Sequence, residues 1–508
     1  MNSPSSLRST LVFLSKNSGL FLITRIVGVC VSIGLLPLFT RYLTTSEYGI
    51  IAILDSTVEI FSALFAAGLG RAVVRFFHDT SDERQRRRVV STGMILTTIS
   101  TICAIIAIAV FYRPVAFLAF KTHEYDRFVF LAVLTLLIGI PGGMASSVLM
   151  ASARSRLICT IELLRIIFSA SLRIYLVVFL EQGVSGVLWT NFATSVLFNF
   201  GLGIWMFFMV GISVDRSLIR PMIRYGLPFA PTIICTFAMN SLNRFYLQNY
   251  GSSEQVGYYQ FAYHLPYTIC MIIVSSFERI WSSHTVFTVS QAPDASNQYV
   301  RISTYFLSFL SFVLFSVAIF ANVLVKIFAA PSYAPAALYI PFIAFGLWLY
   351  NFHIFVRTGV FLSKDTYLIT INYGLTLGLT FLFNWLLIPR YGVYGAAYAS
   401  IIIYFSFSFI GGLIYKGFGY LDLRRMTSVA ILWISLVLIR YQIGSGSIYT
   451  EILCNIFFVV LFLVLMLYLP FCMSKEERGE IFAFVKNKLR QNGSIPQIFK
   501  SKGNITSR

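Results

Sequence analysis

Apolar runs of about 20 residues recur along the whole of this 508-residue chain. A helix needs about 20 such residues to cross a hydrocarbon layer of about 30 Å. Only 12% of the residues are charged, whereas soluble domains average about 25%. The short alternating segments of an outer-membrane barrel are not found in the sequence. These features predict an all-α, polytopic membrane protein.

The apolar runs divide into fourteen predicted membrane spans that are joined by short loops. The number of predicted spans falls to twelve if the last two apolar runs do not cross the membrane. The predicted spans are residues 13–36, 48–68, 89–111, 128–150, 158–180, 186–210, 226–247, 257–278, 302–322, 335–356, 367–388, 393–415, 427–443 and 450–472.

The distribution of basic residues predicts how the spans are oriented. With both termini in the cytoplasm, the cytoplasmic segments hold about four times as many Lys and Arg as the outer loops. Such a bias is typical of the positive-inside rule. We therefore expect a multi-pass protein of the cytoplasmic (inner) membrane with both termini inside. The net charge of +19 then anchors one face to anionic lipid and does not indicate a nucleic-acid partner.

Two different loops recur at nearly the same offset. A Ser-Glu turn before a glycine occurs at Tyr42–Gly49 and again at Tyr250–Gly257, 207 residues apart at the glutamate. A Gly-Val-x-Gly loop at Gly183–Val187 recurs at Gly392–Ala396, 209 residues further on. These offsets predict a duplication with six spans in each copy. The copies are expected to be parallel repeats about an axis along the membrane normal.

The repeat sets the predicted domain boundaries. We expect an N-terminal lobe at residues 1–215, a C-terminal lobe at 216–420, two added helices at 421–473 and a basic cytoplasmic tail at 474–508. Apolar residues in the tail have the spacing of a helix that lies on the inner membrane surface. The basic run Arg84–Arg88 has two interpretations, a cytoplasmic anchor and a phosphate site.

Several segments carry a resemblance to a known family, and they are Pro37–Gly49, Arg224–Tyr263, Ala330–Ala336 and Asn384–Ser400. They resemble the polysaccharide biosynthesis flippases of the multidrug/oligosaccharidyl-lipid/polysaccharide exporter superfamily, which includes O-antigen translocases. The resemblance implies a transporter that moves polyprenyl-pyrophosphate-linked oligosaccharide across the membrane by alternating access, for cell-surface polysaccharide. Asn243 departs from the family pattern, which often has an acid there, so a charge role at this turn is in doubt.

Ionisable residues within spans mark candidate functional sites because they are costly in hydrocarbon. Arg25 and Glu59 lie at similar distances before and after the first outer turn, so they are expected at similar depth. Asp55 and Glu59 are four residues apart and share one helix face. Two interpretations stay open: a structural ion pair from Arg25 to Glu59 or Asp55, and a polar cavity between the lobes.

Arginines are the candidate substrate-binding residues because guanidinium stays charged and holds phosphate oxygens in pairs. Thr24–Gly28 is similar to the Ser-Arg-x-x-Gly segment in the first helix of lipid II flippases, which implies that Arg25 contacts pyrophosphate. Arg173 is the second candidate. Arg244, near the outer end of its span, is either a substrate ligand or a residue that extends its charge to the membrane surface.

Other polar and aromatic residues have simpler interpretations. Glu162 and Arg165 are three apart and are expected to form a local ion pair. Glu278 and Arg279 are expected to anchor the inner end of the eighth span. The aromatic residues between Tyr258 and Tyr267 are typical of an interface belt and of helix packing, although such rings also stack on sugars.

No catalytic residue, metal site or cofactor is predicted. The seven cysteines and five histidines have no ligand spacing, and no phosphate-binding loop of a nucleotide-driven pump is present. We expect a transporter and not an enzyme, with an ion gradient (H⁺ or Na⁺), the membrane potential or product consumption as its energy source. Asp55 and Glu59 are then candidate coupling-ion residues, and the expected partners are the lipid-linked substrate, membrane lipids and polysaccharide polymerase machinery.

Three alternative functions remain. The first is a small-molecule or drug/ion antiporter of the same superfamily. The second is a membrane glycosyltransferase, polymerase or ligase, although the long outer loops usual in those enzymes are missing from the sequence. The third is a non-transporting membrane scaffold, which has no need for charged residues within its spans.

Overall fold

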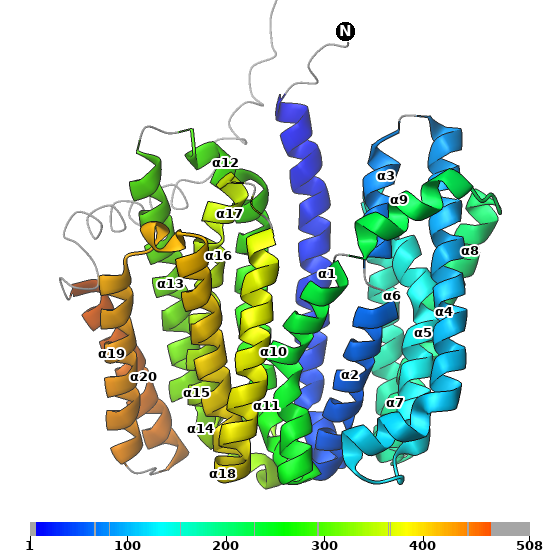
Figure 1. Ribbon diagram of the computed structural model, residues 1–508. Helices are drawn as coiled ribbons and strands as arrows, with labels where there is room; N and C mark the ends of the chain where they lie inside the picture. The colour runs from blue at the N-terminus through cyan, green and yellow to red at the C-terminus, as the bar shows by residue number, and fades with distance from the viewer. Residues whose placement is uncertain are drawn as a thin grey trace, which may run out of the picture.

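The computed structural model describes residues 7–468 except for short gaps at 66–67, 81, 153, 228, 292–293, 364, 366 and 444–446. Over these residues the chain is helical and forms no strand. Two groups of helices stand side by side, a first half (α1–α8) and a second half (α10–α18), and α19 and α20 flank the second half (Figure 1). The fold class predicted from the apolar runs is therefore confirmed.

The first half contains these helices: α1 Leu7–Tyr42, α2 Thr45–Phe65, α3 Leu69–His78, α4 Glu83–Phe120, α5 Asp126–Ala151, α6 Ser155–Ile174, the π-helical turn η1 Tyr175–Phe179, α7 Gly183–Thr194, the π-helical turn η2 Ser195–Phe200 and α8 Gly201–Val210. The link to the second half is α9 Arg216–Gly226.

The remaining elements are α10 Phe229–Tyr250, α11 Ser253–Ile280, the π-helical turn η3 Trp281–Thr285, α12 Val286–Val289, α13 Ala295–Ile319, α14 Ala321–Phe328, the 3₁₀ turn η4 Pro331–Leu338, α15 Ile340–Tyr350, α16 His353–Val356, α17 Thr358–Ser363, α18 Tyr367–Ile414, the 3₁₀ turn η5 Gly417–Tyr420, α19 Leu423–Gln442 and α20 Ile448–Tyr468.

Within the described residues, each of the fourteen predicted spans falls mainly on helical segments, and residues 66–67, 228 and 469–472 of these spans lie outside that description. In the described parts of the chain, nine helices are long and apolar enough to cross a membrane. One of these, α18, covers two predicted spans and bends at Gly392, where φ is +54°. The number of crossings remains a prediction, and the predicted surface helix of the tail lies outside the described residues.

The repeated turn is a helix-capping device. In the first copy, the Glu47 backbone N–H donates to Thr44 Oγ1 (3.2 Å), and the Thr44 backbone N–H donates back to Glu47 Oε2 (2.9 Å). In the second copy, the Gln255 backbone N–H donates to Ser252 Oγ (3.3 Å). The first copy is a complete capping box, whereas the second has the same residue pattern but only this one bond, because Gln255 Oε1 has no described partner. The structural counterpart of Glu47 is therefore Gln255, one residue beyond the glutamate that the sequence comparison aligned.

The two repeated turns also pack against each other. A Cβ added to Gly49 on α2 would lie 1.8 Å from the Ser253 carbonyl oxygen, and one added to Gly257 on α11 would lie 2.0 Å from the Thr45 carbonyl oxygen. The contacts are reciprocal, as expected for parallel repeats about an axis between α2 and α11. Glycine is required here because the backbones touch. We call this end of the bundle, at the bottom of Figure 1, the turn end.

The opposite end of the bundle carries the link between the halves. Helix α9 packs on α3 and α4 of the first half, and Gly226 at its end meets the backbone of Gly68. Asp215 caps α9: the hydroxyl and then the backbone N–H of Ser217 donate to its carboxylate, which lowers the pKa of Asp215. The run Arg84–Arg88 forms the first turns of α4 at this end.

Candidate functional site

Two adjoining cavities lie within the helical bundle. The first has a volume of about 810 Å³ and is lined mainly by α1, α2, α5, α6 and α7. The second has a volume of about 660 Å³ and is lined mainly by α2, α10 and α11. Ser62, Gln260 and His264 line both cavities, so the two are compartments of one site that joins the halves. Their volumes are in the range of ligand-binding pockets.

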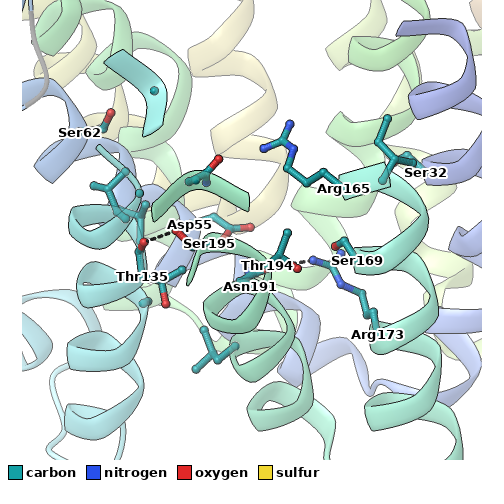
Figure 2. Close-up of a pocket in the computed structure, with 18 of the residues that line it drawn as sticks. Ser32, Asp55, Ser62, Thr135, Arg165, Ser169, Arg173, Asn191, Thr194 and Ser195 are labelled. Atoms are coloured by element: carbon teal, nitrogen blue, oxygen red, sulfur yellow. Dashed lines mark hydrogen bonds between the residues drawn. The ribbon is translucent and has the colours of Figure 1, made fainter. Parts of the chain in front are cut away.

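Arg173 is the central cation of the first cavity. It projects from the last turn of α6 toward Asn191 of α7 (Figure 2), and its Nη2 donates to Asn191 Oδ1 (2.7 Å). Its guanidinium also lies 5.8 Å from the ring centre of Phe39. The Nε is buried and has no hydrogen-bond partner among the residues that the structure describes. Arg173 therefore keeps donor capacity for a ligand.

Asp55 lines the same cavity from α2, and its side chain is accessible. It makes no hydrogen bond or ion pair with any described residue, although Arg173 lies within electrostatic range. Arg165, about two helical turns before Arg173, also lines the cavity and pairs with Glu162. The predicted local ion pair on α6 is therefore confirmed, but sequence reasoning missed that Arg165 faces the cavity.

Glu59 lies in the second cavity, one helical turn from Asp55. Its Oε2 accepts a hydrogen bond from Ser241 Oγ of α10 (2.9 Å), which links the two halves. Asp55 and Glu59 thus share one face of α2, as the spacing predicted, but each opens into a different compartment.

Arg244 is buried, with 6% of its surface exposed. Its Nε donates to Gln260 Oε1 (2.7 Å), its Nη1 donates to the Asn240 carbonyl (2.6 Å), and its guanidinium lies 5.3 Å from the ring centre of Tyr263. The interpretation that it extends to the membrane surface is therefore wrong. The reason is that α10 packs between α2 and α18 and turns this face into the bundle.

Arg25 occupies a different place from the one expected. Its Nη1 donates to Ser275 Oγ of α11 (2.9 Å), and it forms no ion pair with Asp55 or Glu59. It does not line either cavity. The proposed structural pair is therefore wrong, because α1 sets Arg25 against α11 and not against the acids of α2. The accessible Arg25 side chain bridges the two halves beside the site.

Sequence reasoning missed much of the second cavity. Arg357, at the end of α16, lines it and forms an ion pair with Glu278 of α11. Gln260 and His264, one turn apart on α11, line both compartments. The available signal was the presence of polar residues at helical spacing within an apolar span. The side chain of Arg279 lies outside what the structure describes.

The charged lining comes mostly from the first half. The charged residues that line the cavities are Asp55, Glu59, Arg71, Arg165, Arg173, Arg244 and Arg357. Only the last two belong to the second half. Among the described residues no cluster of three or more His, Cys, Asp and Glu is arranged to hold a metal ion.

Solved structures of a lipid II flippase and of multidrug resistance transporters share this fold. A structure of the lipid II flippase MurJ in an inward closed conformation superposes with a TM-score of 0.65 at 13% identity, over 89% of this chain and 98% of that chain. An inward-facing multidrug resistance MATE transporter of the MOP superfamily gives 0.54 at 14% identity, over 78% and 97%. An outward-facing MATE transporter gives 0.52 at 15% identity, over 79% and 95%. At these identities the likeness establishes the fold alone.

The sequence comparisons give the family. No curated protein matches the chain. The sequence model of the family described as "Polysaccharide biosynthesis protein" matches residues 38–338. This match spans more than half of the chain and includes both repeated turns and most of the cavity lining. The chain is therefore a member of the polysaccharide biosynthesis protein family.

Proposed function

We propose that this protein is a flippase that moves a polyprenyl-pyrophosphate-linked oligosaccharide across the cytoplasmic membrane for cell-surface polysaccharide synthesis. The observation that carries the proposal is the two-compartment polar site between the halves, in a chain of this family. A lipid-linked sugar has a large polar head that hydrocarbon excludes. A polar cavity gives that head a path, and the lipid chain stays in the bilayer.

Arg173 is the leading candidate for binding the pyrophosphate. Its guanidinium faces the first cavity and has a buried Nε without a described partner. Hydrogen bonds between charged groups are worth about 1.5–3 kcal/mol. Arg25, which bridges α1 and α11 beside the cavities, would meet the head group as it arrives, and Arg244 would hold the far compartment in shape.

Alternating access follows from the arrangement of the repeats. We place both termini in the cytoplasm because the basic residues lie mainly on that side. The turn end, sealed by Gly49 and Gly257, then faces outward. Residues 1–215 and 216–420 would act as the two moving lobes, and export would separate α2 from α11 at these glycines.

Transport also needs a source of energy. Asp55 and Glu59 are accessible carboxylates beside the cations and would exchange H⁺ or Na⁺. The substrate is expected to come from membrane-bound glycosyl transfer, and the product is expected to pass to polymerase machinery. The chemistry proposed for the cavities is binding and release, with no catalytic residue.

The test is a deletion strain followed by complementation. Deletion should accumulate the lipid-linked oligosaccharide on the inner leaflet, where mass analysis identifies it, and remove the surface polysaccharide. Wild-type protein should restore both. Arg173→Gln should restore less than about a tenth of the export, the effect of losing one charge-assisted contact.

Arg127→Gln is the matched control, since Arg127 is accessible at the start of α5 and lines neither cavity. It should complement fully. A deletion strain with normal surface polysaccharide and no accumulated intermediate would overturn the proposal. If the deletion strain instead became sensitive to small toxic compounds, the drug antiporter function would replace the proposed flippase function.

A further inference from the structure

The arginines of the two compartments differ in how fully protein groups already pair with them. In the first cavity Arg173 keeps an unpartnered donor. In the second cavity Arg244 is held by Gln260, Asn240 and the face of Tyr263. Arg357 is neutralised by Glu278 there, although its Nε has no described partner. Arg71, the third arginine of this lining, is not free either, so the second compartment offers less free positive charge to a phosphate than its arginine content suggests.

The second cavity offers an aromatic surface instead. Tyr259, Tyr263 and Tyr267 succeed one another on α11 at four-residue spacing, with ring centres 6.1 Å and 5.1 Å apart and planes inclined by 24°. Tyr259 is fully buried and Tyr263 is nearly so, whereas Tyr267 is 37% exposed. Since Tyr267 lines the second cavity, the stack ends there in an accessible ring whose orientation is fixed from behind.

Polar groups surround this ring. Ser241 and Asn240 line the cavity from α10, and Gln260 and His264 line it from the same helix as Tyr267. Glu59 contributes a carboxylate that uses one oxygen on Ser241. A pyranose ring has an apolar C–H face and a rim of hydroxyl groups. An aromatic ring beneath and donors and acceptors around the edge match that shape.

We propose that the second cavity is the sugar compartment of the site, and that Tyr267 is its stacking platform for an uncharged or N-acetylated hexopyranose. The assignment rests on the proposed function and divides its site: pyrophosphate binds at Arg173, and the glycan crosses the junction at Gln260 and His264 into the second cavity. Tyr267 is then a specificity residue for the glycan and not for the lipid carrier.

Binding of two probes to the protein in lipid nanodiscs tests this division. One probe is undecaprenyl pyrophosphate without sugar, and the other is the lipid-linked oligosaccharide extracted from the deletion strain. Native mass spectrometry gives the bound fraction of each. Tyr267→Ala should weaken binding of the glycosylated probe about tenfold, the order of magnitude of one lost base–aromatic stacking contact. It should leave binding of the bare carrier within about twofold.

Further variants separate the ring from other effects. Tyr267→Phe should bind both probes as wild type does, because the ring remains. Tyr267→Leu keeps a bulky side chain but has no flat aromatic face, so it should bind the two probes as Tyr267→Ala does. It serves as a second test if Tyr267→Ala does not fold. Arg173→Gln should weaken both probes.

Tyr250→Ala is the matched control. Tyr250 also ends a stacked pair, 6.1 Å from Tyr246 and inclined by 24°, but it lines neither cavity. This variant should change nothing. Equal loss of both probes in Tyr267→Ala, or no loss of either, would overturn the sugar compartment. Failure of the wild type to bind either probe would instead overturn the proposed flippase function.

Discussion

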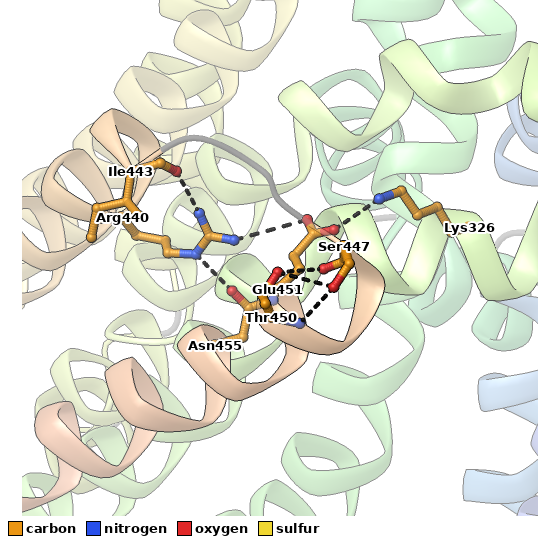
Figure 3. Close-up of polar contacts among 7 residues, drawn as sticks. All are labelled: Lys326, Arg440, Ile443, Ser447, Thr450, Glu451 and Asn455. Atoms are coloured by element: carbon orange, nitrogen blue, oxygen red, sulfur yellow. Dashed lines mark hydrogen bonds and ion pairs between the residues drawn. The ribbon is translucent and has the colours of Figure 1, made fainter.

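Two groups of charged residues inside the helical bundle behave in opposite ways. Between α14, α19 and α20, the Glu451 side chain is completely buried and contacts Lys326 Nζ at 2.8 Å and Arg440 Nη2 at 3.9 Å (Figure 3). Arg440 also donates to Asn455 Oδ1 (2.7 Å) and to the Ile443 carbonyl (3.0 Å). In the first cavity, by contrast, Asp55 has no described hydrogen bond and Arg173 has one (Figure 2).

The contrast teaches how to separate structural charges from functional ones. A charge that leaves water needs compensation, and removing one partner of a buried pair is strongly destabilising. The Glu451 cluster compensates its charges with protein groups, and it fixes the added helices α19 and α20 to the second half. In the first cavity Asp55 stays accessible and the buried Arg173 Nε has no described partner, so compensation of these two charges is left to water or ligand. Stability should depend on the first group and transport on the second.

The largest effect on stability is expected from Glu451→Gln. It leaves the cation of Arg440 buried, with 8% of its side chain exposed, and should lower the free energy of unfolding by about 3 kcal/mol. This loss of stability is measured by thermal unfolding of the purified protein and by the amount of protein recovered from the membrane. Glu124→Gln, at an exposed carboxylate in the loop before α5, should have no effect. If Glu451→Gln lost transport but kept the stability of the wild type, Glu451 would not belong to the structural charges.

A conservative change in the cavity should do the reverse. Arg173→Lys keeps the charge but loses the planar fork that holds two phosphate oxygens. Export in the complementation assay should fall about tenfold, while the melting temperature stays that of the wild type. A melting temperature lowered as much as in Glu451→Gln would place Arg173 among the structural charges.

The smallest effect is expected from Asp55→Asn. If Asp55 takes part in ion coupling, export should fall about fivefold, the lower end of typical coupling between sites. The remaining export should no longer respond to sodium or pH. Export by Asp365→Asn, at an accessible acid outside both cavities, should keep the wild-type response. An unchanged sodium and pH response in Asp55→Asn would remove Asp55 from the coupling site.

Local patterns predicted the fold well because hydrocarbon leaves helices few alternatives. Where the structure describes them, the predicted spans lie mainly on helices, and the loop offsets of 207 and 209 residues predicted the parallel repeat with which the reciprocal contact of Gly49 and Gly257 agrees. Glu47 was matched to Glu254, one residue before its structural counterpart Gln255, because the two turns were compared by residue type. The capping position is instead defined by the hydrogen bond between Thr44 and the residue three positions further on.

The site was predicted less well because partners across helices cannot be read from spacing. Asp55, Glu59 and Arg173 do line the cavities, since charges within spans avoid lipid. One of the two open interpretations of Arg25 paired it with the wrong helix, and one of the two interpretations of Arg244 extended it to the membrane surface. Lys326, Arg440 and Glu451 were not predicted to interact, although the three form an ion-pair cluster around the buried Glu451 carboxylate.

The sequence by itself determined that the chain is a helical membrane protein built from two copies, because apolar length and loop repetition are local properties. It also marked the charges that hydrocarbon does not tolerate unaided. Only the tertiary structure decided which charges meet each other and which remain open to a ligand. The physical reason is that compensation depends on distances of a few ångströms between helices far apart in the chain, and on which helix faces the packing turns inward.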